Sequence, residues 1–345
     1  MSEIINRTSK TFQVMVILAS FIIVVAGMKA AESIIVPFLL AIFISIIASP
    51  PFFWLQRKGI PKGIALVIVI LSFLIFISLI GILIGASVND FTSKLPLYEQ
   101  KLQNQTQSLI MWLTENKFIE PDFELSKAFN PASVLKVVGD TFNQVGNLFA
   151  NGFLILLTVV FMMLEITSLP LKLKKILSNP EDSILKVQSV TQNINKYIAI
   201  KIWISLGTGL LVYFLLLIIG VDYPLLWAVL AFVLNFIPTI GSIIALIPPV
   251  LLTIIQLGFV EALVVLIGYL VINTIMGNIL EPKFMGKGLG LSTLVVFLSL
   301  IFWGFILGPI GMLLSVPLTI TIKIALESSE ETRWLAVLLG NENIE

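Results

Sequence analysis

The segment Pro224–Gln256 constrains the fold most, because it is apolar at both ends and interrupted in the middle. The polar run NFIPTIGS separates its two apolar halves. Pro238 lacks an N–H and disfavours the α region for the residue before it, so a continuous helix is not expected. Inside a membrane, broken backbone is tolerated only where protein covers it or water reaches it. Such segments are typical of transport sites.

A second segment, Leu291–Lys323, repeats this pattern. An apolar run leads to the break Gly308–Gly311, which matches the element Pro238–Gly241 in the first segment. In each copy a short aliphatic run and a further proline follow, Pro248 in the first and Pro317 in the second. We therefore interpret the two segments as an internal repeat.

The composition is that of an integral membrane protein. The chain has 345 residues, of which 58% are hydrophobic and 12% charged, and its mean hydropathy is +1.05. Soluble domains carry about 25% charged residues. The chain has no Cys and no His, which excludes thiolate nucleophiles, disulfides and Cys/His metal sites. We expect no enzyme activity, metal or cofactor, and the net charge of +1 argues against a nucleic-acid partner.

A membrane span needs about 20 apolar residues. We expect about six full transmembrane helices, near Phe12–Met28, Ser33–Ala48, Gly63–Val88, Gly152–Ile166, Lys201–Gly220 and Gly258–Leu280. No small-x-small cleavage motif follows the first apolar run, which predicts a retained first helix. Gly81 and Gly85 form a GxxxG pattern, typical of a close-packing helix face.

The distribution of lysine and arginine predicts the orientation. The segment Pro50–Lys62 has three basic residues and no acid, and Glu165–Lys201 has six lysines against three acids. The region 89–147 has five lysines and seven acids. Because basic residues mark the cytoplasmic side, we expect both termini inside and the region 89–147 outside. Leu95, Tyr98 and Leu102 begin an apolar stripe at helical spacing there, which predicts a small extracytoplasmic helical domain.

Length decides between a crossing and a hairpin for the broken segments. A 33-residue helix would be about 50 Å long, whereas the hydrocarbon core is about 30 Å thick. Two half-helices in a re-entrant hairpin fit better, and this places Lys283 and Lys287 on the basic, inner side. The expected fold is thus all-α, with two broken re-entrant helical hairpins in an inverted repeat. An alternating-access carrier has this architecture.

We expect five parts along the chain. They are transmembrane helices in 1–88, the extracytoplasmic helical domain in 89–147, a fourth helix and a basic cytoplasmic segment in 148–200, a transport core with two helix-plus-hairpin repeats in 201–327, and a cytoplasmic tail in 328–345.

The candidate solute-binding residues offer hydroxyl, amide or bare backbone groups at the two breaks and on the last full helix. They are Asn235, Pro238, Thr239, Gly241, Ser242, Asn273, Asn278, Gly308, Pro309 and Gly311. Two readings stay open at each place. Asn235 and Ser242 either bind solute or satisfy the backbone freed by Pro238. Asn273, with Thr274 and Asn278, forms a polar stripe that either contacts solute or hydrogen-bonds to a neighbouring helix.

Glu281 and Glu261 are the candidate ion-coupling residues. Glu281 either couples to an ion or proton or forms a surface pair with Lys283. Glu261, Glu165 and Lys201 fall near the ends of expected helices, which predicts interfacial positions for all three.

Longer motifs resemble one family. NFIPTIGSIIALIPP, the run from Gly277 to Thr319, and VPFLLAIFISIIASPP at Val36–Pro51 are similar to the autoinducer-2 exporter family of bacterial transporters. The resemblance covers nearly the whole chain and is densest after Ile200. It implies an inner-membrane carrier that is a homo-oligomer, with a pentamer as the expected assembly. Members export the quorum-sensing signal autoinducer-2, and others are linked to sodium(lithium)/proton antiport.

Three functions are compatible with this sequence. The first is a secondary transporter that exports a small polar signal, most simply autoinducer-2, from a site where the two hairpin tips meet. The second is a sodium(lithium)/proton antiporter that uses Glu281 or Glu261. The third is a membrane scaffold without transport, against which the polar breaks argue.

Overall fold

The computed structural model describes residues 10–116, 152–166, 168, 172, 180–285, 290–327 and 329–340. These residues form helices and turns, and no strand occurs among them. The chain divides into two compact units, which are described separately. Unit 1 comprises 1–46, 154–190 and 290–345, and unit 2 comprises 47–153 and 191–289.

Membrane-spanning length is reached by five described helical stretches, as judged by length and composition. They are Glu32–Arg57, Lys62–Ile82, Gln188–Ile219, Phe259–Phe284 and Thr293–Glu327. Two expected spans correspond to shorter apolar helices, Val14–Ala30 and Gly152–Glu165. Many large apolar side chains point outward, among them Ile17, Ile22 and Ile23 at 65–70% exposure. The all-α membrane fold expected from composition is therefore confirmed.

Unit 1 contains α1 (Lys10–Ala30), most of α2 (Glu32–Arg57), α6 (Gly152–Glu165), α13 (Thr293–Glu327) and α14 (Arg333–Leu338). One buried cluster in this unit is formed by Trp303, Ile306 and Leu307 of α13, against which Met28 of α1 and Leu39 of α2 pack. The short helix α14 packs against α13. The tail expected at 328–345 thus contains a short helix.

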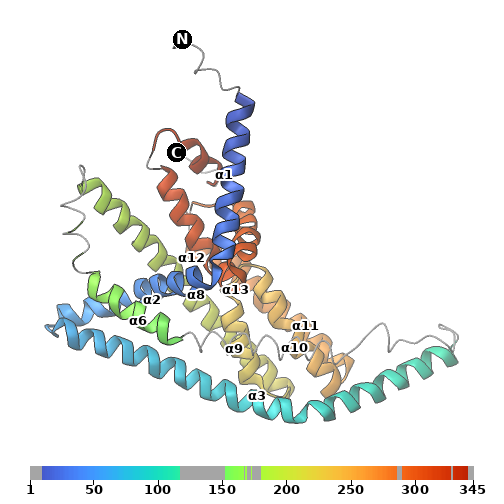
Figure 1. The fold of residues 1–345 in the computed structure, drawn as a ribbon. Helices are drawn as coiled ribbons and strands as arrows, with labels where there is room; N and C mark the ends of the chain where they lie inside the picture. The colour runs from blue at the N-terminus through green and yellow to red at the C-terminus, as the bar shows by residue number, and fades with distance from the viewer. Residues whose placement is uncertain are drawn as a thin grey trace. The chain divides into compact units, whose positions relative to one another are not determined.

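Unit 2 contains α3 (Lys62–Glu115), most of α8 (Pro180–Ile219), α9 (Pro224–Leu234), α10 (Ile240–Gln256), α11 (Phe259–Asn273), the π-helix η1 (Thr274–Leu280) and α12 (Glu281–Met285). Figure 1 shows their course. Its core gathers Trp227 of α9, Leu216 of α8, Leu252 of α10 and Tyr269 of α11, each at most 1% exposed.

Three helices are longer than their expected spans. α2 continues through Pro50 and Pro51 to Arg57, and α3 continues past the apolar span to Glu115. α8 begins at Pro180, well before Lys201. The expected part boundaries after residues 88 and 200 consequently fall inside continuous helices. The helical spacing expected from Leu95 onward agrees with α3, whereas the part of the expected extracytoplasmic domain at 117–147 lies outside the described residues.

Candidate functional site

The first broken segment folds back on itself as a helical hairpin. α9 and α10 are its arms, and they pack against each other. At the open end, the Asp222 N–H donates to Gln256 Oε1 at 2.9 Å, and Gln256 Nε2 donates to the Gly220 carbonyl at 3.2 Å. A side chain at the end of α10 therefore closes the base of the hairpin onto the residues before α9.

The tip of this first hairpin holds a strained residue. Thr239 has φ 60° and ψ −58°, and the Ile240 N–H donates to the Pro238 carbonyl at 2.6 Å. This is the positive-φ form of the γ-turn, which is rare and strained. A β-branched residue such as threonine is especially unfavourable there. Strained backbone clusters at functional sites, and Thr239 is exposed.

Asn235 and Ser242 lie in one hydrogen-bonded chain next to this tip. Asn235 is 5% exposed, and its Nδ2 donates to Ser205 Oγ of α8 at 3.0 Å. Ser242 Oγ donates to Asn235 Oδ1 at 3.4 Å. Both side chains thus bond to other side chains rather than to the backbone around Pro238.

The second broken segment also reverses direction. Gly308 has φ 62° and ψ −152°, a conformation essentially restricted to glycine, and it interrupts α13. Thr319 Oγ1 donates to Ser299 Oγ at 2.9 Å, and Trp303 Nε1 donates to Thr319 Oγ1 at 3.1 Å. Ser299 Oγ also donates to the Ser315 carbonyl at 3.1 Å. Because these partners are 16 or 20 residues apart, the two arms of α13 must lie side by side.

The two tips share one packing feature, which supports the repeat. A Cβ built on Gly241 would overlap the Leu234 carbonyl oxygen, and one built on Gly311 would overlap the Trp303 carbonyl oxygen. The nearest side-chain contacts would be Ile237 Cβ at 3.0 Å and Leu307 Cβ at 2.8 Å, each four residues before its glycine. In both hairpins a glycine therefore lets the returning arm touch the backbone of the first.

Two charged residues, Lys29 and Glu32, lie beside the break of the second hairpin, where the sequence did not predict them. Lys29 Nζ of α1 donates to the Phe305 carbonyl at 2.6 Å and lies 3.9 Å from the centroid of the Phe305 ring. Glu32 Oε1 lies 3.0 Å from the place of a Cβ on Gly308. Pro309 is exposed beside them. No sequence signal links residues this far apart, so sequence reasoning missed both.

Two expectations about charges are wrong. Lys201 does not lie near a helix end but in the middle of α8, which begins 21 residues earlier, at Pro180, and its side chain is buried at 2% exposure. Glu281 pairs with this lysine rather than with Lys283, at 2.6 and 2.7 Å from its two oxygens. Glu261 is exposed in the first turn of α11, as expected.

The polar stripe on the last full helix is only partly covered. Asn273 is half-buried, whereas Thr274 and Asn278 are exposed. Thr274 Oγ1 donates to the Leu270 carbonyl of its own helix at 2.7 Å. Among the described residues, no hydrogen bond joins these three side chains to another helix, so the interhelical reading has no support here.

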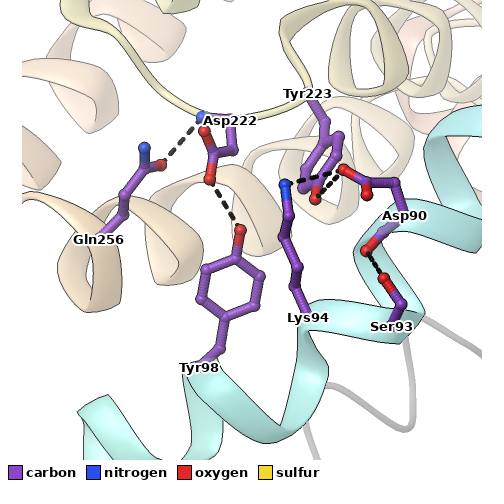
Figure 2. Close-up of polar contacts among 7 residues, drawn as sticks. All are labelled: Asp90, Ser93, Lys94, Tyr98, Asp222, Tyr223 and Gln256. Carbon is purple, nitrogen blue, oxygen red and sulfur yellow. Dashed lines mark hydrogen bonds and ion pairs between the residues drawn. The ribbon is translucent and has the colours of Figure 1, made fainter.

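A polar cluster fixes the base of the first hairpin to α3 (Figure 2). Tyr98 Oη donates to Asp222 Oδ2 at 2.7 Å, and Tyr223 Oη donates to Asp90 Oδ2 at 2.8 Å. Lys94 Nζ lies 2.9 Å from the same Asp90 oxygen. The hydrogen bonds from Lys94 and Tyr223 lower the pKa of Asp90, and burial followed by the bond to Asp222 raises the pKa of Tyr98.

An aromatic group packs beneath these polar contacts. The ring of Phe91 lies 5.8–6.0 Å, centroid to centroid, from the rings of Tyr98, Tyr223 and Trp227. Trp227 Nε1 donates to the Asp222 carbonyl at 2.9 Å. The first hairpin is thus anchored at its base and strained at its tip. In the described part of the chain, no cluster of three or more acidic side chains is arranged to hold a metal ion.

Known proteins match the chain over nearly its full length. The model of the AI-2E family transporters matches residues 18–331. The AI-2 transport protein TqsA of Escherichia coli K12 is 40% identical over 338 residues, which cover 98% of each chain. The putative transport protein YhhT of the same strain is 38% identical over 327 residues, or 94% of this chain and 93% of that one. A putative transport protein of Haemophilus influenzae is 41% identical over 334 residues.

Proposed function

Because this chain belongs to the AI-2E family of transporters, we propose that it exports autoinducer-2 across the cytoplasmic (inner) membrane. The solute is supported by the similarity to TqsA, whose name states AI-2 transport. Export by alternating access is supported by the two broken hairpins, since such breaks are typical of carriers. In this proposal the hairpins open in turn, one toward each face of the membrane. The protein has no catalytic role in it.

The observation that carries the proposal is the strained, polar tip of the first hairpin. Thr239 is exposed in a γ-turn, and α10 starts directly after it, at Ile240. The N–H groups of Ile240 and Gly241 already donate to the Pro238 and Ile237 carbonyls, but the positive end of the helix dipole still favours oxygen atoms that carry negative charge. A threonine hydroxyl beside this helix end suits a small, oxygen-rich solute. Asn235 and Ser242 would then exchange their mutual hydrogen bond for bonds to it.

The other candidate contacts have different roles in this proposal. Gly308, Pro309 and Gly311 bring backbone groups to the second tip. Asn273 and Asn278 offer amides on α11 and η1. The protein is a multipass membrane protein, and we propose a homo-oligomer, specifically a pentamer, with both termini cytoplasmic. The segment 89–147 would lie on the opposite, extracytoplasmic side.

Efflux from vesicles tests the placement of the solute. Asn235→Leu and Thr239→Leu should each reduce autoinducer-2 efflux at least about tenfold, the equivalent of one lost contact of about 1.4 kcal/mol. Ile243→Leu is the matched control, because Ile243 is 53% exposed on the same hairpin and apolar. Efflux is compared per amount of folded protein, because Asn235→Leu also removes the buried bond to Ser205. Full efflux by both polar-site variants would reject the placement.

Sodium(lithium)/proton exchange is a second candidate function. The observation that favours it is the carboxylate of Glu281, whose side chain is 16% exposed within the candidate span Phe259–Phe284. Vesicles loaded with a pH-sensitive dye should then report proton flux driven by sodium or lithium, and Glu281→Gln should abolish it. Glu261→Gln, at an exposed position, is the comparison that separates the two candidate carboxylates. Absence of cation-driven flux at every pH would remove this function.

A further inference from the structure

Lys201 and Glu281 form an ion pair that is costly to bury. Lys201 Nζ lies 2.6 and 2.7 Å from the two carboxylate oxygens, and the side chains are 3% and 16% exposed. Both residues lie within candidate membrane spans. Charges there are rare and are usually functional. A buried ion pair is also a poor source of stability, because apolar side chains of similar volume often do as well.

The rest of the same helix interface needs no charge. A Cβ on Gly207 of α8 would lie 2.5 Å from Met276 Cε, and one on Gly268 of α11 would lie 2.6 Å from Leu215 Cδ2. The helices therefore already approach closely through glycines and apolar side chains. Stability alone gives no reason for a lysine and a glutamate at the end of this interface.

The π-helix places Glu281 against Lys201. Val265, Tyr269 and Met276 are buried at α-helical spacing, so they mark one face of α11 and η1. In an α-helix Glu281, five residues after Met276, would be turned about 140° from it. The Glu281 N–H instead donates to the Met276 carbonyl, five residues back, which brings Glu281 onto the Met276 face. π-Helical turns are rare and frequent at functional sites.

An unused hydroxyl adjoins the pair. Tyr197 precedes Lys201 by one turn on α8, is 3% exposed, and its Oη has no hydrogen-bond partner among the described residues. It lies on the same face of α8 as Lys201, whose ammonium holds Glu281. A buried hydroxyl without a partner is costly. It is therefore available to donate to Glu281 when Lys201 does not.

We propose that Tyr197, Lys201 and Glu281 form a latch that opens and closes in the transport cycle. In the closed state, which the structure shows, the Lys201 ammonium holds Glu281. In the open state the Tyr197 hydroxyl, one turn back on α8, donates to the Glu281 carboxylate instead, so the end of η1 moves along α8. No proton is transferred. The three are positioning residues, and the inference rests on the proposed transport function.

Neutral variants separate a latch from a structural pair. Lys201→Met and Glu281→Met each leave one buried charge and should lower the folded yield. The double variant K201M/E281M should restore the yield and thermal midpoint of the wild type, because it removes both charges. Its autoinducer-2 efflux from vesicles should nevertheless be at least about tenfold below wild type. Wild-type efflux by the double variant would overturn the proposal.

The chain offers a matched control for the hydroxyl. Among the described residues Tyr269 is also buried with an unpartnered Oη, but it lies on α11, twelve residues before Glu281, and not one turn from Lys201. Tyr197→Phe should slow efflux several-fold without lowering the thermal midpoint, whereas Tyr269→Phe should leave efflux unchanged. Equal efflux by the two variants would overturn the latch, even if the double variant fails to fold.

A measurement that needs no solute tests the latch separately from the proposed transport of autoinducer-2. Wild-type vesicles that move no autoinducer-2 would reject the proposed solute, not the latch. Hydrogen–deuterium exchange then decides, because an opening latch should make the amides of Thr274–Glu281 exchange faster than those of Phe259–Asn273. Tyr197→Phe should slow this exchange, and Tyr269→Phe should not. Exchange in Thr274–Glu281 as slow as in α11 would reject the latch.

Discussion

Adding one methyl group at the tip of each hairpin tests how closely the arms must approach. Gly241→Ala places a Cβ against the Leu234 carbonyl oxygen and 2.8 Å from its carbon. Gly311→Ala does the same at Trp303, with the carbon at 2.7 Å. The obstacle is backbone in both cases, so no side chain can rotate away and the arms must separate.

The expected change in the free energy of unfolding follows from the position of each glycine. Overpacking costs about 1–3 kcal/mol, and a contact with backbone belongs at the upper end. Both glycines lie in the first turn after a break, where alanine gains little helix propensity. Gly81 and Gly85 are the controls, because a Cβ there has no described atom within 4 Å. Alanine at those interior positions of α3 should stabilise by about 0.5–1 kcal/mol.

The measurement is the free energy of unfolding in mixed micelles, followed by tryptophan fluorescence. G241A and G311A should each lie about 2–4 kcal/mol below G81A and G85A. If either tip variant is as stable as the two α3 controls, the close approach of the arms is wrong.

Three further substitutions have directions that follow from the structure. Thr239→Gly should stabilise the protein by about 1 kcal/mol in the same unfolding assay, because glycine relieves the positive-φ strain. It should also reduce efflux. A lower free energy of unfolding would contradict the γ-turn. Thr319→Val should cost about 1–3 kcal/mol, because Ser299 and Trp303 lose a buried partner, and an unchanged unfolding free energy would contradict the paired arms of α13. The pKa of Asp90 in the folded protein lies below its ordinary 3.8. The stabilisation by its carboxylate is therefore complete above pH 3.8 and is lost as the pH falls through the folded pKa. Asp90→Asn should have a lower thermal midpoint than wild type near neutral pH and the same midpoint in strong acid.

The breaks in both hairpins were predictable because their cause is local. Pro238 and the Gly308-Pro309 pair disfavour regular helix, each is followed within three residues by a further glycine, and the chain reverses at both. The all-α membrane fold followed likewise from composition and apolar length. The close approach at Gly241 and Gly311 was not predictable, since it depends on how two arms meet in space.

The charge contacts depended on longer-range geometry. Lys201 and Glu281 are 80 residues apart, and a π-helical turn that periodicity does not reveal brings them together. An α-helical projection turns Glu281 away from the Met276 face, so the neighbouring Lys283 was the simpler partner. The same limit applies to Lys29 at Phe305 and to Tyr98 at Asp222, where separations of 276 and 124 residues leave no local signal. The continuation of α3 through Pro96 also runs against local propensity.

Solute protection of a single cysteine addresses the transport role of the first hairpin tip most directly. The chain has no cysteine, so Thr239→Cys introduces a unique thiol. Autoinducer-2 should slow its reaction with a water-soluble maleimide in vesicles, and the modified protein should no longer transport. Ile243→Cys, on the apolar surface of the same hairpin, should react at one rate with and without solute. Equal labelling of Thr239→Cys in both conditions, with transport intact after modification, would contradict a solute pathway at this tip.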